Sequence, residues 1–301
     1  MDFRVFAVPG HGAEDVVVGP DGSVYTGTED GVVHRIDPST GQVSAVANTR
    51  GRPLGIEVLG ADTLLICDAR RGLLTLEVSS GAIETLVDDM KFCNNAAVAA
   101  DGTIYFSDSS SIHPIDEWRA EMVEVTRTGR LRKRDSSGNI MTLEKDLAFA
   151  NGVALAQDES FVAVAETAAR TIVRHWLTGP RAGSRDFLVE GLPGYPDNIA
   201  RGRNGLIWVA LASPKDPLVE RIQRGPLWIR RGVTRIPQPL QPAPKRTVRV
   251  QAYDNLGGLV HDLAGDSQKF HMVTGVREHD GDVWMGGLHE PAVAVLKSSG
   301  G

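Results

Sequence analysis

The sequence predicts an all-β protein, a six-bladed β-propeller, from two observations. Short strand patterns separated by turn residues run along the whole chain of 301 residues, while helical periodicity is scarce. The combination of strands and turns also returns at intervals of roughly 40–50 residues, which is typical of propeller blades. We therefore expect repeated four-stranded units around one axis.

The first unit shows the blade pattern most clearly. Expected strands at 16–18, 23–26, 32–36 and 42–46 are separated by Pro-Asp-Gly, Glu-Asp-Gly and Pro-Ser-Thr-Gly turns. Five further units are expected around the strand patterns at 64–67, 103–106, 161–164, 206–209 and 282–285. With the first unit, these make six blades.

The spacing of equivalent turn residues locates an insertion. From Asp21 through Asp62, Asp101, Asp158 and Asn204 to Asp280 the steps are 41, 39, 57, 46 and 76 residues. The last step predicts an insertion at about residues 214–245, with a helical part that covers the mouth of the axial channel. The segment 3–8 is expected to pair as the outer strand of the last blade, which leaves no long edge exposed.

On periodicity alone a β-sandwich or a seventh, degenerate blade remains open. The length of the chain would by itself favour about two domains. The continuous repeat instead predicts a single domain over residues 1–301.

Composition excludes several classes of partner. The chain has 32 basic and 38 acidic residues, a net charge of -6 and no long basic run, which argues against nucleic acid. Because neither a signal peptide nor an apolar stretch of about 18 residues is evident, we expect a cytoplasmic protein without a membrane partner. Cys67 and Cys93 are expected to be free thiols rather than a disulfide. The oligomeric state is left open.

One polar position recurs in four of the units. Glu14, Asn94, Asn151 and Asp197 each stand seven residues before the turn residue of their unit. Arranged around an axis, their side chains would converge as two carboxylates and two amide oxygens, which suit Ca²⁺ and, less well, Mg²⁺ or Mn²⁺. The alternative is that each side chain only satisfies the backbone of its turn.

Several motifs resemble those of one family. They lie at residues 149–155, 165–167, 191–199 and 278–281, with further matches at 52–55 and 105–111. In this order they resemble the strictosidine synthase-like family, which is similar to gluconolactonases, paraoxonases and diisopropyl fluorophosphatases. The resemblance implies a six-bladed propeller whose axial calcium ion assists the hydrolysis of esters, lactones or phosphotriesters.

The resemblance also implies roles for individual residues. It strengthens the assignment of Glu14, Asn94, Asn151 and Asp197 as calcium ligands. It makes Asp197 the candidate general base or nucleophile, although a role as ligand alone stays open. Asn95 and Asn198, one residue further on, are alternative or supporting ligands.

The substrate-binding candidates are Arg52, Tyr195, His113 and Glu278. Arg52 would anchor an anionic or hydroxylated substrate, or else pair with a neighbouring loop. Tyr195 would line the pocket, as would Trp208 and Trp228, unless these aromatic residues belong to the core.

Two of these candidates rest on the relatives alone. His113 follows the serine run near the channel mouth, where paraoxonases use a histidine pair, but a solvated loop histidine is the alternative. Glu278 lies where strictosidine synthase carries the glutamate of its condensation reaction. Glu166 is expected to have a structural, hydrogen-bonding role.

Neither a Gly-x-Ser-x-Gly nucleophile motif nor a phosphate-binding loop is present. Their absence disfavours a serine hydrolase or a nucleotide-binding protein. The resemblance, together with the complete ligand set, implies an enzyme, a calcium-dependent hydrolase of small-molecule lactones or aryl esters. The alternatives are a condensing or isomerising enzyme on the same scaffold and a propeller that only binds.

Overall fold

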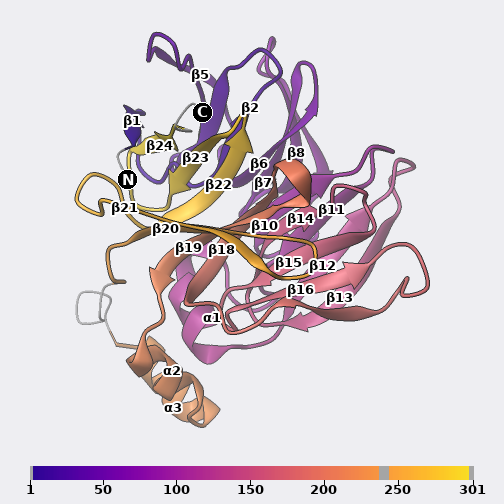
Figure 1. The fold of residues 1–301 in the computed structure, drawn as a ribbon, viewed down its shortest axis with the longest axis vertical. Helices are drawn as coiled ribbons and strands as arrows, with labels where there is room; N and C mark the ends of the chain where they lie inside the picture. The colour runs from indigo at the N-terminus through magenta and orange to yellow at the C-terminus, as the bar shows by residue number, and fades with distance from the viewer. Residues whose placement is uncertain (1–2, 237–243, 298–301) are drawn as a thin grey trace.

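Six four-stranded antiparallel sheets surround a central axis in the computed structural model, which describes residues 3–236 and 244–297 (Figure 1). The first strand of each sheet contacts the first strand of the next, and β22 of the last sheet contacts β2 of the first, so the ring is closed. The structure thus confirms the predicted six-bladed propeller.

The blades follow one another along the chain. The first three consist of β2 (Val16–Val18), β3 (Val24–Gly27), β4 (Val32–Ile36) and β5 (Val43–Asn48); β6 (Pro53–Gly60), β7 (Thr63–Asp68), β8 (Gly72–Glu77) and β9 (Ile83–Val87); and β10 (Cys93–Val98), β11 (Ile104–Asp108), β12 (Gly129–Arg134) and β13 (Ile140–Leu147).

The other three blades include the one that closes the ring. They consist of β14 (Ala150–Leu155), β15 (Phe161–Glu166), β16 (Thr171–Trp176) and β17 (Arg185–Val189); β18 (Gly194–Arg201), β19 (Ile207–Pro214), β20 (Val248–Tyr253) and β21 (Leu259–Gly265); and β22 (Val273–His279), β23 (Asp282–Gly287), β24 (Ala292–Leu296) and β1 (Arg4–Ala7). The pairing of β1 with β24 confirms that the N-terminal strand completes the last blade.

Helices extend two of the loops. The predicted insertion lies between β19 and β20 and forms α2 (Pro217–Gln223) and α3 (Leu227–Thr234); residues 237–243 of this insertion lie outside the described residues. A second insertion, between β11 and β12, was not expected and contains η1 (Ile115–Glu117) and α1 (Trp118–Glu124), while η2 (Arg203–Gly205) forms a short turn after β18. The long step of 57 residues from Asp101 to Asp158 was its signal in the sequence. Within the described residues, no helix is long and apolar enough to cross a membrane.

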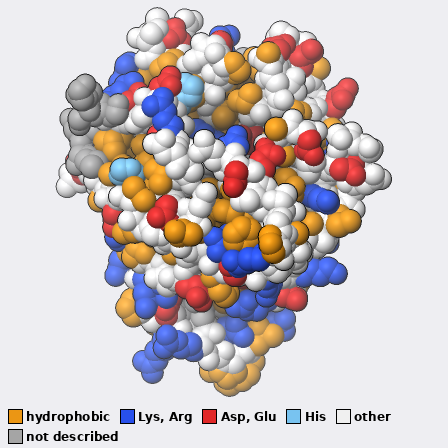
Figure 2. Space-filling view, turned by 45° about the vertical axis from the view of Figure 1, so that its right-hand side comes forward, with side chains coloured by type: hydrophobic (Ala, Val, Ile, Leu, Met, Phe, Trp, Pro, Cys, Tyr) orange, Lys and Arg blue, Asp and Glu red, His pale blue; other side chains and the backbone are white. Residues whose placement is uncertain are grey.

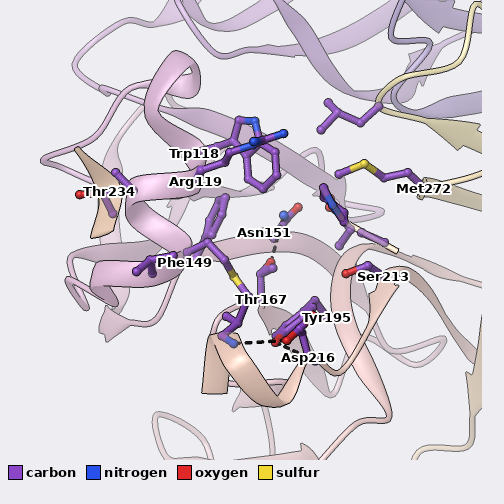
Figure 3. Close-up of a pocket in the computed structure, with 18 of the residues that line it drawn as sticks. Trp118, Arg119, Phe149, Asn151, Thr167, Tyr195, Ser213, Asp216, Thr234 and Met272 are labelled. Atoms are coloured by element: carbon purple, nitrogen blue, oxygen red, sulfur yellow. Dashed lines mark hydrogen bonds between the residues drawn. The ribbon is translucent and has the colours of Figure 1, made fainter. Parts of the chain in front are cut away.

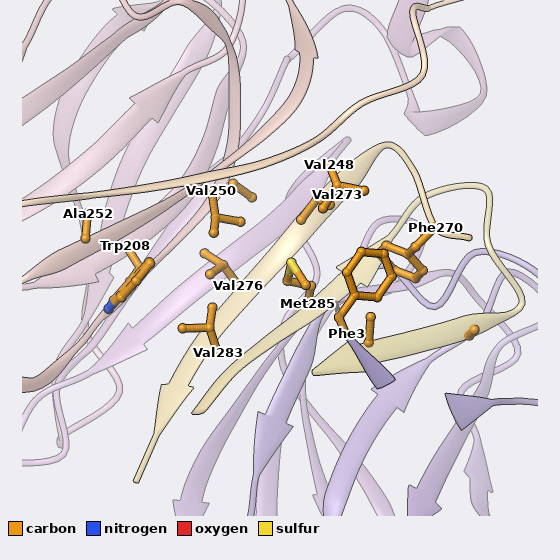
Figure 4. Packing of buried hydrophobic residues seen from close by; sticks show 13 residues of the cluster. Phe3, Trp208, Val248, Val250, Ala252, Phe270, Val273, Val276, Val283 and Met285 are labelled. Atoms are coloured by element: carbon orange, nitrogen blue, oxygen red, sulfur yellow. The ribbon is translucent and has the colours of Figure 1, made fainter. Parts of the chain in front are cut away.

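Hydrophobic side chains fill the wedges between neighbouring blades. Between the fifth and sixth blades, Trp208 and Val250 pack with Val276 and Met285 in a fully buried cluster (Figure 4). Phe3, just before β1, contacts Phe270 edge to face at a centroid distance of 6.2 Å. The closing strand is therefore held by core packing as well as by its hydrogen bonds.

The first strands approach one another closely near the axis because small and polar residues alternate around the ring. At one level along the axis, in blade order, the residues are Asp15, Gly55, Asn95, Gly152, Asn198 and Gly275. A Cβ atom on Gly152 would lie 2.2 Å from the backbone nitrogen of Ile199 in the next blade. Glycine is thus required for this approach.

We expect Gly152→Ala to lower the free energy of unfolding by about 3 kcal/mol, the upper end of the usual cost of overpacking, because the clash is with backbone. Urea denaturation measures the change. Gly232→Ala in α3 is the matched control, since an added Cβ meets nothing within 4 Å there. Equal stabilities of the Gly152→Ala variant and the wild type would show that the ring can expand at no cost.

Candidate active site

A cavity of about 380 Å³ opens at the end of the channel where the first strands begin. All four predicted ligand residues, Glu14, Asn94, Asn151 and Asp197, line it. Glu14 precedes β2, and the other three lie in β10, β14 and β18, the first strands of their blades. The structure therefore brings together the side chains that the repeat predicted.

The two amide side chains are held in one orientation by hydroxyl groups of their own blades. Asn94 donates from Nδ2 to Ser109 Oγ at 3.0 Å. Asn151 donates from Nδ2 to Thr167 Oγ1 at 3.1 Å, as Figure 3 shows. Each hydroxyl donates its own proton to a backbone carbonyl of the next blade, Ser109 to Ala150 at 2.6 Å and Thr167 to Pro196 at 2.7 Å. Because the hydroxyl can then only accept from the asparagine, the amide nitrogen must face it.

This leaves the oxygen atoms without partners. Asn94 Oδ1, Asn151 Oδ1 and Glu14 Oε2 are buried and accept no hydrogen bond from the described residues. Buried polar atoms are nearly always paired in native proteins. Three unpaired acceptors beside the Asp197 carboxylate therefore indicate a site for a ligand that supplies positive charge or protons.

The pKa values of the two carboxylates support the same conclusion. Burial raises the pKa of Glu14 well above its ordinary value, and the nearby Asp197 raises it further, although Arg52 opposes this rise. Burial likewise raises the pKa of Asp197 to about 7, with the Asn151 amide acting in the opposite direction. A cation between the two carboxylates would remove the cost of their burial and repulsion.

The donor set fits Ca²⁺. Within the part of the chain that is described, no three His, Cys, Asp or Glu side chains form a metal-binding group, so the soft or nitrogen ligands that zinc prefers are missing here. Two carboxylates and two amide oxygens are hard ligands with a total charge of about -2, which calcium favours. Glu14, Asn94, Asn151 and Asp197 are the residues that would hold the ion.

At the next level of the channel the protein supplies donors and a positive charge of its own. Asp15 accepts hydrogen bonds from the backbone of Val16 and Ile56 and from Asn95 Nδ2, at 2.9, 3.1 and 3.2 Å. Burial raises the pKa of Asp15 to about 6, and the buried guanidinium of Arg277 opposes this rise. Arg277 also forms an ion pair with Glu57. This level thus contains its own cation.

The rest of the cavity wall is mostly apolar. Phe149 and Tyr195 come from the propeller, Trp118 and Met122 from α1, and Val219 from α2 (Figure 3). The Tyr195 hydroxyl accepts from the backbone nitrogen of Asp216 at 3.2 Å, and Asp216 caps α2 through Leu218 N at 2.8 Å. The insertion therefore forms a wall of the cavity, on the rim where it was predicted.

Comparison with known proteins identifies the family. Profiles described as strictosidine synthase and as strictosidine synthase-like, N-terminal, match residues 94–180 and 4–36. The Arabidopsis thaliana protein STRICTOSIDINE SYNTHASE-LIKE 10 is 36% identical over 262 residues, which span 81% of this chain and 69% of that protein. This chain belongs to the strictosidine synthase-like family.

Solved structures with the same architecture are more distant. A gluconolactonase from Xanthomonas campestris aligns with a TM-score of 0.71 and 15% identity over 98% of this chain and 89% of that one. Regucalcin from Agrobacterium tumefaciens, described as a calcium-binding protein, aligns with a TM-score of 0.69 and 13% identity over 98% and 93% of the two chains. At these identities the likeness shows the six-bladed fold alone.

The structure does not place every candidate residue at the cavity. Glu278 accepts hydrogen bonds from Trp208 Nε1 at 2.7 Å and from the backbone of Arg203 at 3.0 Å. It lies near the end of β22, four residues beyond Thr274, whose hydroxyl donates to Glu14 O at 2.8 Å. Four strand residues span about 13 Å, so Glu278 lies at the opposite rim and the expectation of substrate binding there is wrong.

His113 and Arg52 are also placed outside the cavity wall. His113 is buried and pairs with Glu117 and Glu124 at 2.8 and 3.4 Å, so it is neither a solvated loop residue nor a pocket residue. Arg52 is buried and donates to Gly12 O at 3.0 Å, which matches the alternative role of holding a neighbouring loop. Of the four substrate candidates only Tyr195 lines the cavity.

The remaining expectations have mixed outcomes. Trp208 belongs to the core and Trp228 is exposed, so neither lines the cavity. Glu166 accepts from Ala148 N at 2.8 Å, as its structural role requires, and Cys67 and Cys93 are both free thiols.

Ser109 and Thr167 were missed as orienting residues. Their signal is a hydroxyl residue 15 or 16 positions after each asparagine.

We expect one divalent cation to bind at this site and Glu14→Gln to weaken Ca²⁺ binding at least about tenfold, because it removes one of two ligand charges. Isothermal titration of chelator-treated protein measures the affinity. Glu84→Gln, the same substitution at an exposed position of β9, should leave it unchanged. Equal affinities of the Glu14→Gln and Glu84→Gln variants would place the ion elsewhere.

Proposed function

We propose that this protein is a calcium-dependent hydrolase of lactones or aryl esters. The observation that carries the proposal is the set of unpaired oxygens of Glu14, Asn94 and Asn151 beside the Asp197 carboxylate, in a cavity whose wall is otherwise mostly apolar. A purely structural position would be expected to satisfy these atoms internally. The fold shared with a gluconolactonase and with regucalcin supports the same interpretation.

The residues of the cavity would have different roles in the hydrolysis. When bound, Ca²⁺ would polarise the carbonyl of the substrate and stabilise the negative charge that develops on its oxygen. Asn94 and Asn151 would offer oxygen ligands in a fixed orientation, because each amide nitrogen is hydrogen-bonded to a hydroxyl group of its own blade. Asp197 would take a proton from an attacking water or attack the carbonyl itself.

The apolar wall favours substrates with a hydrophobic acyl or aryl group. Phe149, Met122 and Val219 can exclude water around the ester while leaving its carbonyl at the polar end of the cavity. The volume of about 380 Å³ is within the range of small-molecule sites.

The geometry supports a condensing enzyme less well. The glutamate that the family resemblance offered for that chemistry, Glu278, lies at the opposite rim and is bonded to Trp208. The binding-only alternative gives no reason to leave carboxylate and amide oxygens unpaired at the cavity.

Asp197→Asn, which keeps an oxygen ligand but removes one of the two ligand charges, should bind calcium more weakly, and at saturating calcium its turnover should still be at least about a hundredfold lower, the usual scale for loss of a general base. A panel of lactones and aryl esters, assayed with and without chelator, gives the wild-type activity. Asn94→Asp, which adds a ligand charge, should bind calcium more tightly and lose less activity. Near-normal turnover of calcium-loaded Asp197→Asn would limit this residue to the role of ligand.

Val219→Asn should raise KM about tenfold for a hydrophobic aryl ester, because one apolar contact of valine size is lost. Since this contact is made equally before and during the reaction, kcat should stay unchanged. A small lactone that does not reach α2 serves as the internal control. A fall in kcat with both substrates would mean that α2 positions the catalytic groups.

A further inference from the structure

Hydrophobic and basic side chains gather on the outer surface of the α2–α3 insertion. Leu218, Leu227, Trp228 and Ile229 are all exposed, and the Trp228 residue retains 74% of its accessible surface. Figure 2 shows hydrophobic and Lys or Arg side chains side by side at the lower end of the molecule, where Figure 1 places these helices. We call the exposed apolar residues together with Arg221, Arg224, Arg231 and Arg235 the helical patch.

The patch has a charge opposite to that of the whole chain. Residues 215–235 contain six basic and two acidic residues, a local charge of +4, whereas the chain carries -6. Within the described residues, Arg221, Arg224 and Arg235 form no ion pair, while Arg231 contacts Glu124 at 3.4 Å. The arginines therefore present their charge to the outside.

The helices are held firmly from their inner side. Gln223 donates to Met122 O at 2.7 Å, and Thr234 donates to Glu124 Oε1 at 3.1 Å. Arg170 forms an ion pair with Glu220 at 2.8 Å. The exposure of the patch is thus a property of a fixed surface and does not come from loose helices.

The arrangement within α3 matches an interfacial helix. Trp228, Arg231 and Arg235 follow at intervals of three and four residues and so share one face. Exposed tryptophan favours the headgroup level of a membrane interface, and clustered arginines are attracted to anionic lipid, so this surface offers both kinds of contact.

We propose that the helical patch docks this protein onto an anionic membrane surface. Two copies of the chain would bring arginines against arginines, which opposes a dimer through this face. Peripheral docking needs no membrane-spanning segment, so the absence of one from the sequence does not exclude it, and this proposal replaces our expectation of no membrane partner. Leu218 of the patch also borders the cavity, and Val219 and Val233 of the same helices line it, so docking would bring the cavity close to the lipid.

Co-sedimentation with vesicles tests the proposal. The wild type should bind vesicles of phosphatidylcholine with phosphatidylglycerol more tightly than phosphatidylcholine alone, and salt should weaken this binding. Each arginine near an anionic surface contributes about fivefold, so Arg224→Gln with Arg235→Gln should lower the partition coefficient about 25-fold. Trp228→Ser should lower it about tenfold.

Leu256→Ser and Arg201→Gln are the matched controls. Both residues are exposed, and both lie at the other rim, where Arg201 pairs with Ile207 at the end of β18. They should bind vesicles like the wild type.

Three outcomes would overturn the proposal. One is that the wild type fails to bind the anionic vesicles. Another is that the patch variants and the rim controls lose binding equally. The third is a dimer, seen by light scattering, that Trp228→Ser dissociates, which would assign the patch to a second copy.

Discussion

The candidate site depends on a contact between neighbouring blades. The hydroxyl groups of Ser109 and Thr167 each form two hydrogen bonds. Each donates to a backbone carbonyl of the next blade and accepts from the asparagine of its own blade. The position of a blade and the orientation of its amide are thus set by the same atom. The close approach of the strands, which Gly152 permits, keeps these groups within hydrogen-bonding distance.

The repeat explains why so much of the fold, and the meeting of four polar side chains at one cavity, could be predicted from one sequence. Equivalent positions in a closed ring of blades must face the axis together, so Glu14, Asn94, Asn151 and Asp197 could be found by their common distance from a turn. The same regularity located the insertion after β19 and the closing strand β1. These features are periodic, and periodicity can be recognised without coordinates.

What could not be predicted lies outside the repeat. Whether Glu278 reaches the cavity depends on its place along β22, and the motif around it contains nothing that distinguishes one rim from the other. His113 and Arg52 form bonds with α1 and with the first loop, and such contacts between non-equivalent segments leave no regular pattern. The unexpected α1 was visible only as extra length between two turns.

Arg277 gives the channel a cation that cannot diffuse away. This guanidinium pairs with Glu57 and opposes the rise that burial causes in the pKa of Asp15, so the chain itself supplies positive charge near the centre of the ring. At the cavity end, Glu14, Asn94 and Asn151 keep buried oxygens that accept no hydrogen bond from the described residues. The two levels remain coupled, because in addition to burial the negative charge of Asp15 contributes to the raised pKa of both Glu14 and Asp197. A change of charge at the centre of the ring would therefore change the acidity of the carboxylates at the cavity.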